Sequence, residues 1–394
     1  MEAISNIKIS NFKGIKSLSF SPANINIIVG KNNSYKTSVL EAINLCYNHK
    51  KLPQHPYPES LVNRSAENAT IEISEGSISK KIGIFPDSNL VRSTLKEKTL
   101  DAIKKYVEES SRNPAEDIHN IMKKIDQLVE DYVTKIKTLE GVVITEGRDK
   151  TLILSNRTLR DPEIPDIFEL EQSLEPIIKK MSKGKSERHS LFRAPYLPAF
   201  LRRPFFLHIG ANEAKGEVVL MKRYDNWQSY SEEQAVALRR RIEEKIRQYE
   251  LLRNFDRLDN NYITYKGDPK PEPVEMVGDG FKTMYSILHK MAEADGKKFT
   301  LLLDEPGRHM HMGYIMQLRK SFIEMAKNKV QIFLTTHNRD LIEDILSEEL
   351  PEKEKKFLQD NLIFIKMDYG DSQKLSYKEA KEVQNELLLD LRGV

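Results

Sequence analysis

The stretch INIIVGKNNSYKTSVLEAI, residues 25–43, decides the fold class of this sequence. Its apolar run at 25–29 is typical of a buried strand, and the apolar residues that follow the lysine recur at helical spacing. Gly30, Lys36 and Thr37 match the GxxxxGK[ST] pattern, in which backbone N–H groups, a lysine and a hydroxyl hold phosphate groups. Strand, glycine loop and helix occur in the order that this pattern requires. The stretch therefore predicts a phosphate-binding P-loop.

One position of the loop departs from the pattern, because Tyr35 stands where a glycine is expected. If the position requires φ > 0, the tyrosine costs about 1 to 3 kcal/mol of strain, which weakens a site without abolishing it. Restoring glycine is then expected to tighten nucleotide binding by up to ~1 to 2 kcal/mol. Weaker binding would indicate a ring that packs on the nucleotide or on a neighbouring helix. The residues predicted to contact the nucleotide here are Gly30, Lys31, Asn32, Asn33, Ser34, Tyr35, Lys36, Thr37 and Ser38.

The stretch KKFTLLLDEPGRHMHMGY, residues 297–314, carries the second signal. An apolar strand at 299–303 delivers Asp304 and Glu305 at its carboxyl end, which is a Walker B arrangement. A carboxylate is needed there because Mg²⁺ bridges the β- and γ-phosphates, and a second carboxylate orients the attacking water. We predict that Asp304 and Thr37 hold the metal and that Glu305 is catalytic. The alternative is a strand that merely ends in a solvated acidic turn.

A third signal lies in KVQIFLTTHNRDLI, residues 329–342, where another short apolar strand ends at His337. A histidine at the end of a strand that follows the Walker B strand is placed to hydrogen-bond the γ-phosphate or the attacking water. We therefore predict that His337 and Lys36 act in catalysis beside Glu305. A histidine with a purely structural role is the alternative.

The fourth signal is VEMVGDGFKTMYSIL, residues 274–288, in which Gly278, Asp279 and Gly280 precede a helical apolar pattern. Exposed amides and the helix dipole make such a helix start an anion-binding site. We predict that these three residues contact the nucleotide. An ordinary glycine turn explains the same residues equally well.

Composition narrows the class of protein. Over 394 residues, Lys and Arg number 62 against 59 Asp and Glu, so a nucleic-acid site requires a local patch. The single Cys46 excludes an intramolecular disulfide and is typical of a reducing compartment. No stretch approaches the ~18 apolar residues of a membrane span, and the amino terminus lacks an apolar signal core. We expect a cytoplasmic protein without membrane contact.

The chain divides into three predicted parts: a first ATPase segment at 1–88, an insertion at 89–203 and a second ATPase segment at 204–394. Two helical patterns broken at Asn113-Pro114 begin the insertion, which is either a lid or interaction arm or a helical layer packed on the body. Basic and aromatic residues at 191–210 either contact DNA or flank a core strand.

With these motifs in this order, the chain resembles the ABC-type ATPase heads of the SMC, RecF and OLD (overcoming lysogenization defect) group. NFKGIKSLSF at 11–20 is similar to the family's opening, and LLLDEPGRHMHM followed by QIFLTTHNRDLI is closest to OLD-like AAA ATPases. The resemblance covers roughly residues 1–85 and 205–394. It implies an α/β P-loop NTPase fold with a mixed sheet, an antiparallel N-terminal β-subdomain and a mainly helical insertion, and it implies ATP and Mg²⁺ as ligands.

The resemblance also implies a homodimer or higher oligomer of heads, with nucleotide held between the P-loop of one chain and the signature of another. Residues 277–280 occupy the signature position but lack its usual serine. OLD nucleases carry a TOPRIM domain, whereas only about sixty residues follow His337, so we expect any nuclease or toxin to be a separate effector protein. The predicted function is a nucleotide-driven switch in DNA maintenance or antiphage defence. The alternative is a catalytically weak nucleotide-binding scaffold for a partner protein.

Overall fold

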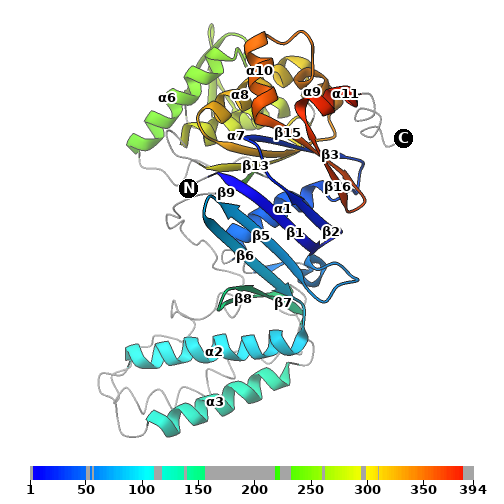
Figure 1. Cartoon of the computed structure of the whole chain (residues 1–394). Coiled ribbons are helices and arrows are strands. Elements are labelled where there is room, and N and C mark those ends of the chain that lie inside the picture. The colour runs from blue at the N-terminus through cyan, green and yellow to red at the C-terminus, as the bar shows by residue number, and fades with distance from the viewer. Residues whose placement is uncertain are drawn as a thin grey trace.

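The computed structural model describes most of the chain and places its strands in three sheets (Figure 1). The described residues are 3–49, 54–55, 57–110, 118–136, 140–155, 218–221, 232–259, 262–293, 299–308 and 310–384. The predicted basic and aromatic segment at 191–210 and the predicted helix break at Asn113-Pro114 lie outside these ranges. No helix within them combines the length and the hydropathy of a bilayer-spanning segment.

A six-stranded mixed sheet contains the P-loop strand at its centre, in the order β16-β15-β3-β14-β13-β9. The strands are β3 (Ile25–Gly30), β9 (Val218–Met221), β13 (Thr300–Asp304), β14 (Gln331–Thr335), β15 (Leu362–Asp368) and β16 (Asp371–Ser376). All are parallel except β16. Because parallel strands share a direction, the carboxyl ends of β3, β13 and β14 meet at one edge.

Helices cover both faces of this sheet, which explains the continuous apolar runs in its strands. One core joins Ile25, Ile27 and Val29 of β3 to the helices after the insertion, while Ile28 faces the opposite core and helix α1. The helices of the first core are α6 (Glu232–Gln248), α7 (Asp279–Glu293), α8 (Met312–Lys327), α9 (Arg339–Ile345), α10 (Glu352–Asn361) and α11 (Tyr377–Glu382). Helix α1 (Lys36–Asn48) packs between this sheet and the next one.

A seven-stranded sheet in the order β2-β1-β5-β6-β7-β8-β4 forms the predicted antiparallel β-subdomain. Its strands are β1 (Ile4–Phe12), β2 (Ile15–Phe20), β4 (Gln54–His55), β5 (Ala69–Glu75), β6 (Ile78–Phe85), β7 (Gly141–Glu146) and β8 (Asp149–Ser155). Only β4 and β8 pair in parallel. β7 and β8 form a hairpin that continues this sheet, because β7 pairs with β6.

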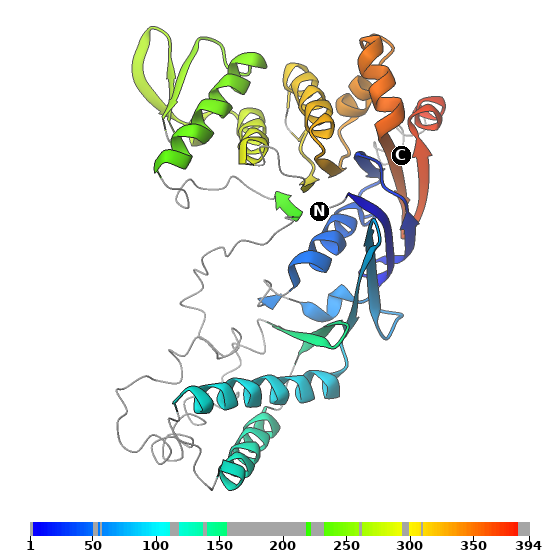
Figure 2. The same cartoon turned by 60° about the vertical axis from the view of Figure 1, so that its left-hand side comes forward.

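Two long helices, α2 (Ser88–Ser110) and α3 (Ile118–Lys135), form a hairpin at the end of the molecule opposite α8 and α10 (Figures 1 and 2). Val91 at the start of α2 is buried near Gly141 of β7, so the hairpin is anchored on the antiparallel sheet. Ile125 and Val129 on one face of α3 are also buried. The limits of the predicted insertion stay a prediction.

A small antiparallel sheet between α6 and α7 has no counterpart in the sequence interpretation. It consists of β10 (Phe255–Asp259), β11 (Tyr262–Tyr265) and β12 (Asp268–Pro273). Short 3-10 helices lie at Pro58–Leu61 and Val274–Met276, the second directly before α7. α6 ends at Gln248, seven residues before β10 begins.

Candidate nucleotide-binding site

The P-loop connects the carboxyl end of β3 to α1, as the sequence predicts. Gly30 opens the loop with φ 147°, and a Cβ at this residue would lie 2.3 Å from the Met367 carbonyl oxygen of β15. Such a contact is shorter than real Cβ contacts, so only glycine fits here. The loop therefore starts against the neighbouring parallel strand.

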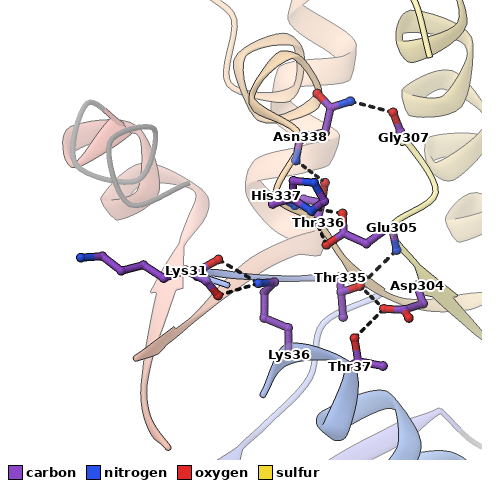
Figure 3. Close-up of polar contacts among 11 residues, drawn as sticks. Lys31, Lys36, Thr37, Asp304, Glu305, Gly307, Thr335, Thr336, His337 and Asn338 are labelled. Carbon is purple, nitrogen blue, oxygen red and sulfur yellow. Dashed lines mark hydrogen bonds and ion pairs between the residues drawn. The ribbon is translucent and has the colours of Figure 1, made fainter. Parts of the chain in front are cut away.

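Lys36 is the first residue of α1, and its side chain is folded into the loop (Figure 3). The ammonium group donates to the carbonyl oxygens of Gly30 at 2.9 Å and Lys31 at 2.8 Å. Burial lowers the pKa of the amine below its ordinary value of 10.5, and the carboxylates of Glu305 and Asp304 oppose this shift. A buried cation in the curve of the loop is placed to bind an anion.

The hydroxyl of Ser34 indicates that the loop can bind a phosphate group. Its hydroxyl oxygen is buried and makes no hydrogen bond within the part of the chain that the structure describes. The backbone N–H of Ser34 donates to the Lys31 carbonyl at 3.3 Å, which closes the loop into a tight turn. An unsatisfied buried hydroxyl in the same loop as the Lys36 ammonium is suited to a ligand with strong acceptor oxygens, such as phosphate.

Tyr35 adopts the left-handed conformation, with φ 66° and ψ 24°, at the N-cap of α1. The condition under which the sequence predicts strain at this position is therefore met. Its side chain makes no capping hydrogen bond and is 39% exposed. The ring packs over Gly14 in the turn between β1 and β2.

The predicted metal-binding pair meets across two elements. The Thr37 hydroxyl on α1 donates to Asp304 Oδ1 at the end of β13, at 2.9 Å. Thr335 at the end of β14 donates its hydroxyl to the same carboxylate oxygen at 2.6 Å. A hydroxyl and a carboxylate in contact at a strand edge form the oxygen donor set that Mg²⁺ takes in nucleotide sites.

Glu305 is held in the left-handed region as well, with φ 53°. Its backbone N–H donates to both the carbonyl and the hydroxyl oxygen of Thr335, at 3.2 and 3.1 Å. This pairing ties the residue after β13 to the end of β14 and turns the glutamate side chain toward His337 (Figure 3). Such a turn in a non-glycine residue costs energy, and residues of this kind cluster at functional sites.

His337 lies against Glu305 through its backbone and its ring. The backbone N–H donates to Glu305 Oε2 at 3.0 Å, and the ring Nδ1 lies 2.7 Å from Oε1. The imidazole is about half exposed, at 45%, so it faces the open side of the strand edge. The structure thus brings together all five residues to which the sequence assigned catalysis or metal binding: Lys36, Thr37, Asp304, Glu305 and His337.

Two further polar residues at this edge carried no predicted role. Asn338 caps α9 by accepting from the Leu341 N–H at 3.1 Å, and its side-chain amide donates to the Gly307 carbonyl at 2.7 Å. The residue therefore fastens the turn after Glu305 to the start of α9. Thr335 and Asn338 flank His337 in the quoted stretch, and their position at a strand end was the only available sequence signal.

Comparison with known proteins identifies the family. Residues 3–342 match the model of the AAA ATPase domain. The chain belongs to the AAA ATPase domain family. This match and the sheet arrangement confirm the predicted α/β P-loop ATPase fold.

Individual relatives of this AAA ATPase are distant. An uncharacterized protein of Methanocaldococcus jannaschii is 28% identical over 120 residues, which cover 30% of this chain and all of that protein. The SMC head domain from Thermotoga maritima is 12% identical, with 95% of this chain and 99% of that one covered, at a TM-score of 0.41. The Smc head domain with an extended coiled coil, bound to the C-terminal domain of ScpA from Pyrococcus furiosus, is 12% identical. The match covers 98% of this chain and 100% of that one, at a TM-score of 0.45.

The predicted signature residues of the AAA ATPase lie at the start of α7, which begins at Asp279. A Cβ at Gly278 would meet nothing within 4 Å, whereas one at Gly280 would lie 3.4 Å from the Tyr314 ring. Asp279 pairs with Lys282 of its own helix at 3.0 Å. No hydrogen bond or ion pair of the described residues joins this turn to the P-loop, so its predicted contact with nucleotide stays a prediction.

Proposed function

We propose that this AAA ATPase hydrolyses ATP in a Mg²⁺-dependent reaction at the edge formed by β3, β13 and β14. The observation that carries the proposal is the contact of Thr37 with Asp304 beside the contact of Glu305 with His337. These pairs combine an oxygen donor set for a metal with a carboxylate and an imidazole for a reacting water. The buried Lys36 ammonium and the unsatisfied Ser34 hydroxyl both lie in the P-loop and support phosphate binding there.

Each residue has a distinct proposed role. Lys36 exchanges its two carbonyl partners for phosphate oxygens, and the backbone N–H groups of 30–38 surround the phosphate chain. Thr37 and Asp304 hold Mg²⁺, which when bound offsets negative charge on the β- and γ-phosphates. Glu305 orients the attacking water and accepts its proton. His337 holds the Glu305 carboxylate in place and donates to the γ-phosphate.

The finer biological role is also a proposal, and it rests on the resemblance of the motifs to the SMC, RecF and OLD group. We infer an OLD-like cytoplasmic head that works as a homodimer or higher oligomer, with residues 278–280 of one chain completing the nucleotide site of another. The switch serves DNA maintenance or antiphage defence, acts through a separate effector such as a nuclease or toxin, and can contact DNA. The open space around Gly278 supports a signature that receives a partner chain.

A second candidate function is nucleotide binding without turnover, as a scaffold for a partner protein. The left-handed Tyr35 favours it, because strain in the loop opposes tight phosphate binding. The scaffold and the ATPase differ in one observable quantity, which is the release of inorganic phosphate.

Phosphate release from ATP with Mg²⁺ tests the proposal directly, over a range of protein concentrations and with and without DNA. The wild type should release phosphate, and Lys36→Ala should abolish both release and ATP binding. Lys353→Ala is the matched control, because Lys353 is exposed on α10. ATP binding without phosphate release selects the scaffold, and the absence of both overturns the two candidates.

A further inference from the structure

A contact between two turns explains why Tyr35 occurs in this P-loop. A Cβ placed on Gly14, in the turn between β1 and β2, would lie 1.8, 2.0 and 2.2 Å from Cζ, Cε1 and Cε2 of the Tyr35 ring. These distances are far below van der Waals contact, so the ring occupies the space that any side chain at position 14 needs. A side chain at position 14 and the Tyr35 ring in its present position therefore cannot occupy this space together.

The backbone conformation of Gly14 does not itself require a glycine. Its φ lies outside the left-handed region, in contrast to Gly30 and Gly370. The three atoms nearest to a Cβ at position 14 all belong to the Tyr35 ring, so an alanine there requires the ring to shift. The ring contact can therefore be tested by substitutions at position 14 and by substitutions at position 35.

The turn that carries Gly14 is itself braced by the carboxyl-terminal strands. A Cβ on Gly370, between β15 and β16, would lie 2.7 Å from the Gly14 carbonyl oxygen. Met367 of β15 in turn packs against Gly30, where the P-loop begins. The Tyr35 ring therefore packs on a turn that contacts the β15–β16 connection, while the start of the loop contacts β15 itself.

Tyr35 holds its backbone in a conformation that it does not prefer. A left-handed tyrosine persists where its surroundings determine its place, and α1 offers no side-chain cap at this position. The packing of the ring on Gly14 supplies such a contact. Because Lys36 follows directly, the position of the ring also sets where the phosphate-binding lysine enters α1.

We propose that Tyr35 is a positioning residue: its ring, seated on Gly14, keeps the P-loop in its phosphate-binding shape, so that the turn between β1 and β2 helps to set nucleotide affinity. This inference rests on the proposed function for its ligand, ATP. It assigns the side chain of Tyr35 a role that is separate from its backbone N–H.

Three substitutions at position 35 separate the ring from the backbone strain. Tyr35→Phe keeps the ring and should bind ATP within about twofold of the wild type. Tyr35→Ala removes the ring but keeps a Cβ in the left-handed region, and it should bind ATP about tenfold more weakly. Tyr35→Gly relieves the strain as well, so it should bind about fivefold more tightly than Tyr35→Ala but about twofold more weakly than the wild type, in contrast to the tightening that strain alone predicts.

A double-mutant cycle that combines Gly14→Ala with the substitutions at position 35 measures the coupling between the two residues. Gly14→Ala should weaken ATP binding about tenfold in the wild type and in Tyr35→Phe, but by less than about twofold in Tyr35→Ala, where the space is open. The measurement is the dissociation constant of ATP by calorimetry, with the unfolding free energy followed by denaturant as a control for global destabilisation. An effect of Gly14→Ala that is the same in all three backgrounds overturns the positioning role. A wild type that binds no ATP overturns the proposed function and this inference together, whereas ATP binding with an additive cycle overturns only the inference.

Discussion

His337 and Glu305 meet at two points, since the histidine backbone N–H donates to Oε2 at 3.0 Å and the ring Nδ1 lies 2.7 Å from Oε1. Both carboxylate oxygens are thus engaged from the end of one neighbouring strand. The glutamate backbone is held by the same strand through Thr335. Because both the backbone and the carboxylate of Glu305 are held in place, the side chain does not need to be ordered again in each catalytic cycle, which favours its use as a base.

Replacing Glu305 by glutamine should leave ATP binding nearly intact and lower the turnover rate by about 10² or more. The amide preserves the size of the side chain and an acceptor for the His337 N–H, but it does not accept a proton from water. Calorimetric ATP binding and phosphate release measure the two effects. Glu343→Gln is a suitable control, because Glu343 pairs with Arg339 on the partly exposed face of α9.

Replacing Thr335 by valine should raise the Mg²⁺ concentration for half-maximal hydrolysis by roughly tenfold, as expected when a partner of a metal-binding carboxylate is lost. The variant removes the hydroxyl that donates to Asp304 and accepts from the Glu305 N–H, while the shape of the side chain is kept. Thr335→Ser retains the hydroxyl and should behave like the wild type. Equal Mg²⁺ dependence in all three proteins would show that Thr335 has only a packing role.

Lys36 should give the unfolding free energy a specific pH dependence in the absence of nucleotide. Since its native pKa is lowered below 10.5 by burial, the unfolded chain binds more protons than the native one between the native pKa and 10.5. The contribution of Lys36 to stability therefore rises as pH increases through that window. Denaturant titrations of the wild type and Lys36→Met at matched pH values measure it, and the difference in unfolding free energy, wild type minus variant, should increase with pH. A difference that stays constant up to pH ~10.5 would contradict the burial of the charge.

Mixing two inactive variants should restore activity if the site needs two chains. Lys36→Ala removes the P-loop lysine, and Gly278→Arg places a cation at the proposed signature, where a Cβ meets nothing within 4 Å. Gly278 is preferred to Gly280 because a Cβ at Gly280 already lies in contact with the Tyr314 ring, at 3.4 Å. At equal mixing, about a quarter of the wild-type rate is expected, because half of randomly exchanged dimers are mixed and each has one intact site of two.

The check on this experiment is chain exchange, which mass photometry of size-tagged variants follows. Mixed dimers without recovered phosphate release would mean that each chain completes its own site. The two-chain arrangement would then be wrong, while hydrolysis by the wild type would be unaffected.

Contiguous stretches of sequence were sufficient to predict the strand edge at which the candidate site residues meet. Residues 25–43, 299–305 and 330–337 each contain a buried strand and the polar residues that follow it, so local apolar patterns identified them. The role of Thr335 was not predictable, because it depends on the pairing that places Asp304 opposite Thr335. The seat of Tyr35 on Gly14 depends in the same way on a turn distant in sequence.

The small sheet after α6 was missed for a different physical reason. β12 has the sequence DPKPEP, in which prolines and charges are typical of a loop. Its pairing with β11, supported by the hydrogen bond from Tyr265 to Glu272, makes it a strand. Local propensity therefore failed where a neighbouring strand supplied the structure.

The order of strands around the P-loop has a consequence for the synthesis of the protein. β3 lies at residues 25–30, whereas both of its neighbours, β14 and β15, lie beyond residue 330 and are made about 300 residues later. Asn26 of β3 donates to the Ile332 carbonyl, 306 positions later in the chain. On the ribosome the loop sequence therefore remains without its neighbouring strands until residues 331–368 have emerged, because pairing over such separations forms late. ATP cannot stabilise the nascent chain through this site during that interval, so the nucleotide site is completed only after β14 and β15 have been made.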